Sequence, residues 1–415
     1  MQKKNILIIN YVFPPYPGIG GRRWAKFAKY LHRNGHQVFV IGAQNPFSYV
    51  STFINDIKEL PKENLYYLPA LYPKSMISPI HSLADKYRYQ FWYRVLPFFT
   101  KGNYYDRTIF WKRQVQEKAK ELIHTKKIHT VIISSPPFHY AYHVLQLKDK
   151  YPFVKFIVDY RDEWTFNNIH GYAIIGKARQ AYEQYLEKYV CEKADYILSP
   201  AEDIINQYLK QRYPLLSKKM ILLNHSFDKD DFPDTGMTHK NSSISFAYAG
   251  TMYAAESFFQ NIHLFLDRLS EKYPLIFNKV DIKFYTIGEF VYPDILQKYS
   301  DKLQINYNVP ANRLFQELKT VHYLFIFYNE RAKNYFTTKF AEYLYLQKPL
   351  LYYGPEGKVS EYITTHKLGI HLKDGLFAEQ LIHLLENKHT FEFSDELINS
   401  WDIIHNIRKI EQLLS

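Results

Sequence analysis

The stretch Asn5–Ile41, NILIINYVFPPYPGIGGRRWAKFAKYLHRNGHQVFVI, decides the fold. Its first six residues have the length and composition of a buried strand, which the proline- and glycine-rich loop Tyr11–Gly21 ends. Apolar side chains then recur at i, i+3, i+4 and i+7 from Trp24 to Leu31, which predicts a helix. Gln37–Gly42 reads as the next strand. A strand, loop, helix and strand in this order imply a parallel sheet with a right-handed crossover.

The same alternation continues along the chain and predicts two doubly wound α/β domains. We expect an N-terminal domain over 1–232, a polar, turn-rich linker at 233–243, a second domain over 244–400, and an amphipathic last helix within 401–415. Further strands are expected at Thr130–Ser134, Phe156–Tyr160, Ala194–Leu198, Met220–Leu223, Ile244–Ala249, Ile282–Ile287, Ile305–Tyr307, Tyr323–Phe327 and Leu350–Tyr353, and a short helix at Tyr335–Tyr345.

Composition excludes several classes of protein. The 415 residues suffice for large cores, and a single cysteine, Cys191, excludes a disulfide framework and a cysteine-based zinc site. No apolar run approaches the ~20 residues that span a bilayer, and the short N-terminal apolar stretch lacks the features of a signal peptide. The net charge is +12, and seven lysines and arginines precede the first acidic residue, Asp56. Such a field attracts nucleic acid, an anionic membrane or phosphorylated small molecules.

A glycine-rich loop at the end of the first strand is the first candidate anion site. Gly18, Gly20 and Gly21 allow close approach of a ligand, and Arg22 follows at the start of the helix, whose N–H groups favour anions. The loop is not a G-x-G-x-x-G dinucleotide motif, because Arg23 occupies the sixth position.

A second candidate anion site is the segment Thr337–Leu344, TTKFAEYL, in the second domain. Thr337 or Thr338 can cap a helix whose free N–H groups would bind a phosphate. Glu342 lies one turn further on, where a carboxylate can accept hydrogen bonds from a sugar diol.

At this point the chain resembles a known family, the bacterial GT-B glycosyltransferases of family 4. The opening stretch is similar to theirs, and so are ILLNHSFDKDDF, AYAGTMY and TKFAEYLYLQKPLLYYG, in the same order along nearly the whole chain. The resemblance implies two Rossmann-like domains facing each other across a cleft, with the last helix crossing back to the first domain. It also implies a nucleotide-diphosphate sugar as donor, held mainly by the second domain, retention of the anomeric configuration, and neither a cofactor nor a metal.

The sequence departs from the family pattern at the donor site. Glu342 matches the second glutamate of the family's Glu-x7-Glu motif, which binds the donor ribose, but Asn334 stands where the first belongs. The family's basic pair for the diphosphate is missing after the first strand of the second domain, where Gly250 and Thr251 stand. Two residues are the obvious substitutes, Arg331 and Lys339.

Three residues of the first domain are candidates for contact with the sugar or the acceptor. His139 follows a strand end and could contact the sugar; it shares a helix face with His143, but no third metal ligand is evident. Arg161 and Asp162 stand where the family often has a His-Asp pair. Asp162 could bind or deprotonate the acceptor hydroxyl; alternatively, it pairs with Arg161 or caps the next helix.

The sequence therefore predicts a retaining, sugar-nucleotide-dependent glycosyltransferase. Its acceptor would be a glycan or a polyprenyl-linked glycan in capsule, O-antigen or exopolysaccharide synthesis. A GT-B-fold sugar-nucleotide 2-epimerase and a non-catalytic sugar-nucleotide-binding subunit remain alternatives, whereas no motif supports nucleic acid as a partner. We expect a cytoplasmic protein bound peripherally to the anionic inner face of the plasma membrane. The basic and aromatic segments Arg22–Asn34 and Tyr87–Gln114 are the candidate contacts, unless their aromatic side chains fill the core.

Overall fold

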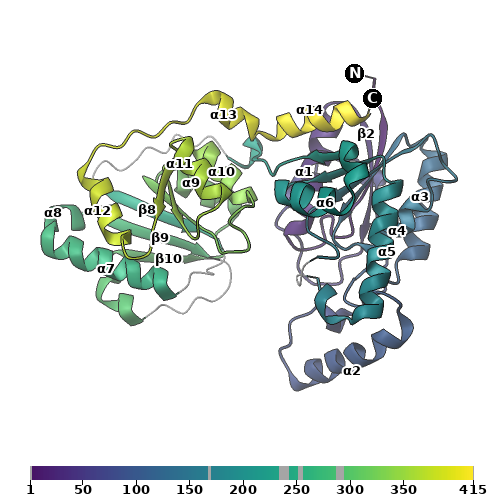
Figure 1. The fold of residues 1–415 in the computed structure, drawn as a ribbon, viewed down its shortest axis with the longest axis horizontal. Coiled ribbons are helices and arrows are strands. Elements are labelled where there is room, and N and C mark those ends of the chain that lie inside the picture. Colours follow the sequence, from purple (N-terminus) through teal and green to yellow (C-terminus); the bar gives the residue numbers. More distant parts are fainter. Residues whose placement is uncertain (1, 167–169, 233–242, 251–255, 287–293, 415) are drawn as a thin grey trace. The chain divides into compact units, whose positions relative to one another are not determined.

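The computed structural model describes residues 2–166, 170–232, 243–250, 256–286 and 294–414. The chain forms two compact units, one made of residues 1–224 with 406–415 and the other of residues 225–405 (Figure 1). Among the residues described, no helix is both long and apolar enough to cross a bilayer.

The first unit is built on a seven-stranded parallel sheet, in the order β3-β2-β1-β4-β5-β6-β7. The central strands are entirely buried apart from their first residues, as continuous apolar runs in parallel sheets require. The strands are β1 (Asn5–Ile9), β2 (Gln37–Ala43), β3 (Leu65–Leu68), β4 (Thr130–Ser135), β5 (Lys155–Tyr160), β6 (Tyr196–Ser199) and β7 (Met220–Leu222). The helices are α1 (Arg22–Arg33), α2 (Leu83–Phe99), α3 (Lys112–Thr125), α4 (His139–Leu145), α5 (Lys177–Lys193) and α6 (Lys210–Arg212).

The second unit repeats the plan with a six-stranded parallel sheet, in the order β10-β9-β8-β11-β12-β13. Its strands are β8 (Ile244–Ala249), β9 (Val280–Thr286), β10 (Leu303–Tyr307), β11 (Tyr323–Phe327), β12 (Leu350–Tyr353) and β13 (Gly369–Leu372). Its helices are α7 (Glu256–Lys272), α8 (Pro274–Phe277), α9 (Ala311–Lys319), α10 (Thr338–Leu346), α11 (Lys358–Thr365), α12 (Phe377–Glu386) and α13 (Asp395–Ser400).

The last helix, α14 (Ile403–Leu414), ends in the first unit. Asn406 donates to the Asn224 carbonyl at 2.8 Å, and Glu411 lies 3.2 Å from the imidazole of His36. Both chain ends therefore lie in the same unit, close together in Figure 1. The first unit ends at Asn224 rather than at 232, because Phe227 and Phe232 pack in the core of the second.

The helix predicted over Arg22–Asn34 forms as α1, and Trp24 and Phe27 belong to the core. Its cations are paired within the first unit, which makes this segment a poor membrane contact. Lys26 donates to Asp56 at 2.9 Å, Arg33 binds Glu59, and Arg23 pairs with Asp159 at 3.2 Å.

Some elements differ from the expectation. The helix expected at Tyr335 begins at Thr338, because Thr337 caps it: the Thr337 hydroxyl accepts the Phe340 N–H at 3.3 Å. The edge strands β3 and β13 are additional elements, and no bounds were predicted for α2, α3 or α5 of the first unit or for α9, α11 and α12 of the second. The predicted linker 233–243 lies outside the described residues except for Ser243.

Candidate functional sites

Three predicted donor-binding residues meet in the second unit, where β8 ends and α10 begins. Gly250 follows β8 with a φ of 143°, and a Cβ atom placed on it would lie 2.2 Å from Nζ of Lys339. This lysine occupies the first turn of α10. Glu342 lies one turn further on, and its charge acts on Lys339. The lack of a side chain at Gly250 therefore leaves space for the ammonium group of Lys339.

The ammonium group of Lys339 is held against an aromatic ring. It lies 4.3 Å from the centroid of the Tyr248 ring and donates to the Tyr248 hydroxyl at 3.3 Å. The Tyr248 ring is itself stacked on Phe327, with 4.1 Å between centroids. Burial lowers the pKa of Lys339 to about 8, and the negative charge of Glu342 only partly opposes this effect. A diphosphate could supply the missing negative charge.

The start of α10 adds backbone donors to this lysine. Thr337 caps the helix, and the N–H groups of Thr338 and Lys339 precede the first backbone hydrogen bond of the helix, which Phe340 donates to the Thr337 carbonyl at 3.1 Å. The Thr337 hydroxyl lies 3.1 Å from the hydroxyl of Tyr328, the residue that follows β11. This contact holds the cap in place. A cation and a helix N-terminus at one place are typical of phosphate sites.

The other predicted donor-binding residues of this unit lie elsewhere or outside the description. The side-chain oxygen of Asn334 accepts the Lys358 N–H at 3.1 Å, so it caps the start of α11. Arg331 is exposed on the loop after β11, where its N–H is bound by the Asn329 side chain. Thr251 lies outside the described residues.

In the first unit, the glycine-rich loop contacts Arg161. A Cβ atom on Gly20 would lie 2.6 Å from the Arg161 guanidinium, whereas one on Gly21 would lie 2.2 Å from the Val12 carbonyl. Gly21 is therefore needed for packing of the backbone. Gly18 has a φ of 112° and open space beside it, and the Arg22 guanidinium lies over the Phe53 ring at 5.4 Å.

Unpaired polar atoms gather where the neighbouring strands β1, β4 and β5 end. Arg161 follows β5 and donates to the Pro136 carbonyl, but its Nε is buried without a hydrogen-bond partner in the described part of the chain. The hydroxyls of Tyr11, Ser134 and Ser135 share this condition. The two serines are consecutive residues of β4, so their side chains point to opposite faces of the sheet. Arg161, which lies beside Gly20 and is only partly buried, is therefore the group at this edge that a ligand could reach.

Asp162 lies beside a histidine. Its carboxylate is 3.3 Å from Nε2 of His170, and the two side chains are 42% and 32% exposed. An accessible carboxylate next to an imidazole can take part in proton transfer.

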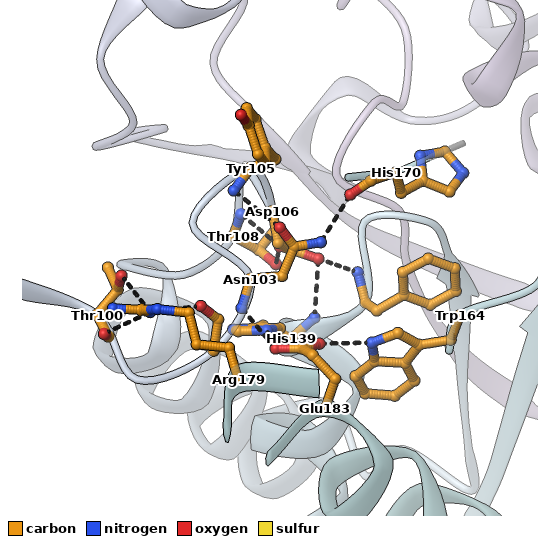
Figure 2. Close-up of polar contacts among 12 residues, drawn as sticks. Thr100, Asn103, Tyr105, Asp106, Thr108, His139, Trp164, His170, Arg179 and Glu183 are labelled. Atoms are coloured by element: carbon orange, nitrogen blue, oxygen red, sulfur yellow. Dashed lines mark hydrogen bonds and ion pairs between the residues drawn. The ribbon is translucent and has the colours of Figure 1, made fainter. Parts of the chain in front are cut away.

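His139 is instead committed to a buried polar network, which Figure 2 shows. Its Nε2 lies 2.7 Å from Glu183, which also accepts the N–H of Asn103 at 2.6 Å and the indole N–H of Trp164 at 2.7 Å. Asp106 accepts the backbone N–H groups of Phe138, at 2.6 Å, and of His139, at 3.3 Å, at the start of α4. The network therefore ties α4 and α5 to the loop after α2.

The protonation of His139 is set by this network. Burial by itself lowers the pKa, but the charges of Glu183 and Asp106 raise the pKa of His139 to about 9. The neighbouring His143 is the opposite case: burial and the charge of His139 lower its pKa to about 3. His139 is therefore an imidazolium at neutral pH, held in place by a buried carboxylate.

This arrangement predicts a pH-dependent stability. The folded pKa of His139 lies above the value of about 6.5 in an unfolded chain, so its contribution is full below pH ~6.5 and is lost as the pH rises through ~9. In urea unfolding, the difference in unfolding free energy between wild type and His139→Gln should shrink by about 3 kcal/mol between pH 6 and pH 10. A difference that stays constant over this range would show that His139 is neutral.

Asp106, Asn103 and Glu183 were not predicted as site residues from the sequence. The sequence does contain a pattern that indicates Glu183. Glu183 and Glu187 lie at helical spacing on the same face of α5 as Leu186 and Val190, and all four side chains are buried. Two carboxylates at helical spacing on an apolar face indicate buried partners. Glu187 accordingly accepts the hydroxyl of Thr165 at 2.7 Å, and burial raises its pKa.

Comparison with known proteins identifies the fold. No protein-family model matches the chain, and no curated protein matches it in sequence. Among solved structures, it is similar to a Listeria monocytogenes protein assigned as a UDP-N-acetylglucosamine 2-epimerase, with 10% identity and a TM-score of 0.56 over 99% of this chain and 95% of that one. The complex of S. aureus MnaA with UDP has 12% sequence identity and a TM-score of 0.51 over 99% of this chain and 98% of that one. An α-glucosyltransferase bound to UDP and DNA has 12% sequence identity and a TM-score of 0.48 over 100% of this chain and 95% of that one. This likeness is too low to support an argument. The first two matches confirm the predicted fold class, two Rossmann-like parallel-sheet units of the GT-B type.

Proposed function

We propose that the chain is an enzyme acting on a nucleoside-diphosphate sugar, whose diphosphate is bound in the second unit by Lys339 and the N-terminus of α10. The observation that carries this proposal is the partly buried ammonium group of Lys339, with its depressed pKa, beside Gly250 and next to free helix N–H groups. Glu342 would accept hydrogen bonds from the ribose. Glu342 lies one helical turn after Lys339. This spacing suits a ligand in which the ribose diol is next to the diphosphate.

Two reactions are compatible with such a donor site. Epimerisation at C2 is supported by the match of the whole chain with a protein assigned as a UDP-N-acetylglucosamine 2-epimerase. Transfer of the sugar to an acceptor, with retention, is supported by the sequence motifs that resemble family 4 glycosyltransferases. The fold comparison favours epimerisation at least as strongly as the motifs favour transfer. A non-catalytic binding subunit would show donor binding without turnover.

The residues of the first unit would serve either reaction. Asp162, accessible and paired with His170, is the candidate acid or base, and Arg161 beside Gly20 would bind a sugar. His139 would act indirectly, by positioning the start of α4, since its imidazole is occupied by Glu183. For transfer, the acceptor would be a glycan or a polyprenyl-linked glycan, and the latter would bring the protein to the inner face of the plasma membrane.

One experiment separates the reactions. The purified protein is incubated in D2O with the nucleotide sugar that stabilises it most in a thermal-shift panel, and the products are followed by proton NMR. An epimerase needs no acceptor and yields the C2 epimer with deuterium at C2, because the C–H bond there is broken and remade. A transferase consumes the donor only when an acceptor is added and gives a glycoside with the donor's anomeric configuration. A bound but unconverted donor under both conditions indicates a binding subunit.

A further inference from the structure

The helix α2 carries an unpartnered apolar face. Its inner side is anchored by Leu96, which is buried in a cluster with Tyr72 and Tyr104, and by the partly buried Trp92. Its outer side bears large apolar residues at spacings of 4, 4 and 7 residues, which place them on one face of the helix. They are Leu83, Tyr87, Phe91 and Phe98, which are 74%, 71%, 58% and 86% exposed.

The position of α2 adds to this exposed surface. The helix lies at one end of the first unit, away from the sheet (Figure 1). Ile80 and Phe99, just outside and at the end of the helix, are 50% and 73% exposed and extend the apolar surface. Single exposed apolar residues are common on proteins, but several in one row mark a binding surface.

Basic side chains surround this face. From Pro73 to Tyr105, Asp85 is the one acidic residue, whereas Lys74, Lys86, Arg88, Arg94 and Lys101 are basic. Asp85 is bound by the Ser82 hydroxyl at 2.7 Å and lies 3.7 Å from Arg88. Lys86, Arg94 and Lys101 are exposed. The surface therefore combines apolar side chains with an excess of positive charge.

We propose that the outer face of α2 docks the protein on an anionic lipid membrane. Aromatic rings settle at the level of the lipid headgroups, and lysines and arginines beside them are attracted to anionic lipids. A second copy of the chain is a poorer occupant, because a symmetric contact through this face would bring the like charges of Arg88 and Arg94 together. The surface goes beyond the reaction proposed above and is tested without a sugar nucleotide.

The test is flotation of the full-length protein with vesicles of phosphatidylcholine alone or with phosphatidylglycerol. Wild type should bind the anionic vesicles at low salt and be released as salt shortens the range of electrostatic attraction. Neutralising three bases should weaken binding about 100-fold, and removing three aromatic side chains about 10-fold. The first variant is Lys86→Gln, Arg94→Gln and Lys101→Gln, and the second is Tyr87→Ser, Phe91→Ser and Phe98→Ser.

Matched controls change equally exposed residues of the same unit away from α2, and they should bind as wild type does. They are Lys58→Gln, Lys62→Gln and Lys218→Gln for charge, and Phe153→Ser with Leu215→Ser for apolar surface. The proposal is overturned if wild type does not prefer anionic vesicles at low salt, or if the α2 variants bind like the controls. It is equally overturned if the aromatic variant abolishes a dimer seen by analytical ultracentrifugation while vesicle binding is unchanged.

Discussion

Replacing Lys339 with methionine is expected to weaken binding of the nucleoside-diphosphate sugar by at least about 100-fold, the usual effect of removing one partner of a buried charge pair. The methionine keeps most of the apolar stem while removing the ammonium group that faces Gly250. Isothermal titration calorimetry with the nucleotide sugar from the thermal-shift panel measures the loss. Lys348→Met is a control on the same segment beyond the end of α10, and its affinity should match that of wild type.

The fold should survive the Lys339→Met substitution. Because burial disfavours the charged form of Lys339, the neutral side chain removes a cost, and the melting temperature without ligand should not fall. The dependence of affinity on pH is a second check. Because the pKa of Lys339 is about 8, wild-type affinity should decline above pH 8 by up to about tenfold per pH unit. The affinity of the variant should not show this decline. An unchanged affinity in the variant would remove Lys339 from the donor site.

Replacing Glu183 with alanine is expected to destabilise the first unit by about 3–5 kcal/mol, because it leaves the imidazolium of His139 buried without its carboxylate. The indole N–H of Trp164 and the backbone N–H of Asn103 lose their acceptor in the same step. Urea unfolding at pH 7 measures the change.

The exposed neighbour Glu192 on α5 provides a matched control, and Glu192→Ala should change the unfolding free energy by less than about 1 kcal/mol. The loss in Glu183→Ala should be smaller at pH 10, where His139 is neutral in both proteins. A loss below about 1 kcal/mol at pH 7 would contradict an ion pair between Glu183 and His139.

The overall architecture could be predicted from the sequence because its strands are continuous apolar runs. NILII and YLFIF are five-residue runs rich in β-branched or aromatic side chains, a length and composition that favour a buried strand. The edge strands β3 and β13, with sequences LYYL and GIHL, were missed because edge strands are only half-buried, and these two lack the run of β-branched residues that marks a buried strand.

The candidate sites were predictable only in part. Spacing along one helix places Lys339 and Glu342 one turn apart, and the start of α10 after a strand places them near Gly250. The role of His139 depends on Glu183, which lies far along the chain, so no local pattern could show that its imidazole is occupied. Asn334 likewise looks like a substituted glutamate in the motif, yet its side chain caps α11.

Binding of the diphosphate through Lys339 can be measured by comparing two ligands on two proteins. Calorimetry gives the affinities of the nucleoside diphosphate and of the corresponding nucleoside for wild type and for Lys339→Met. Wild type should bind the diphosphate far more tightly than the nucleoside, and Lys339→Met should lose most of this difference while nucleoside binding is unchanged. An equal preference for the diphosphate in both proteins would show that Lys339 does not bind it.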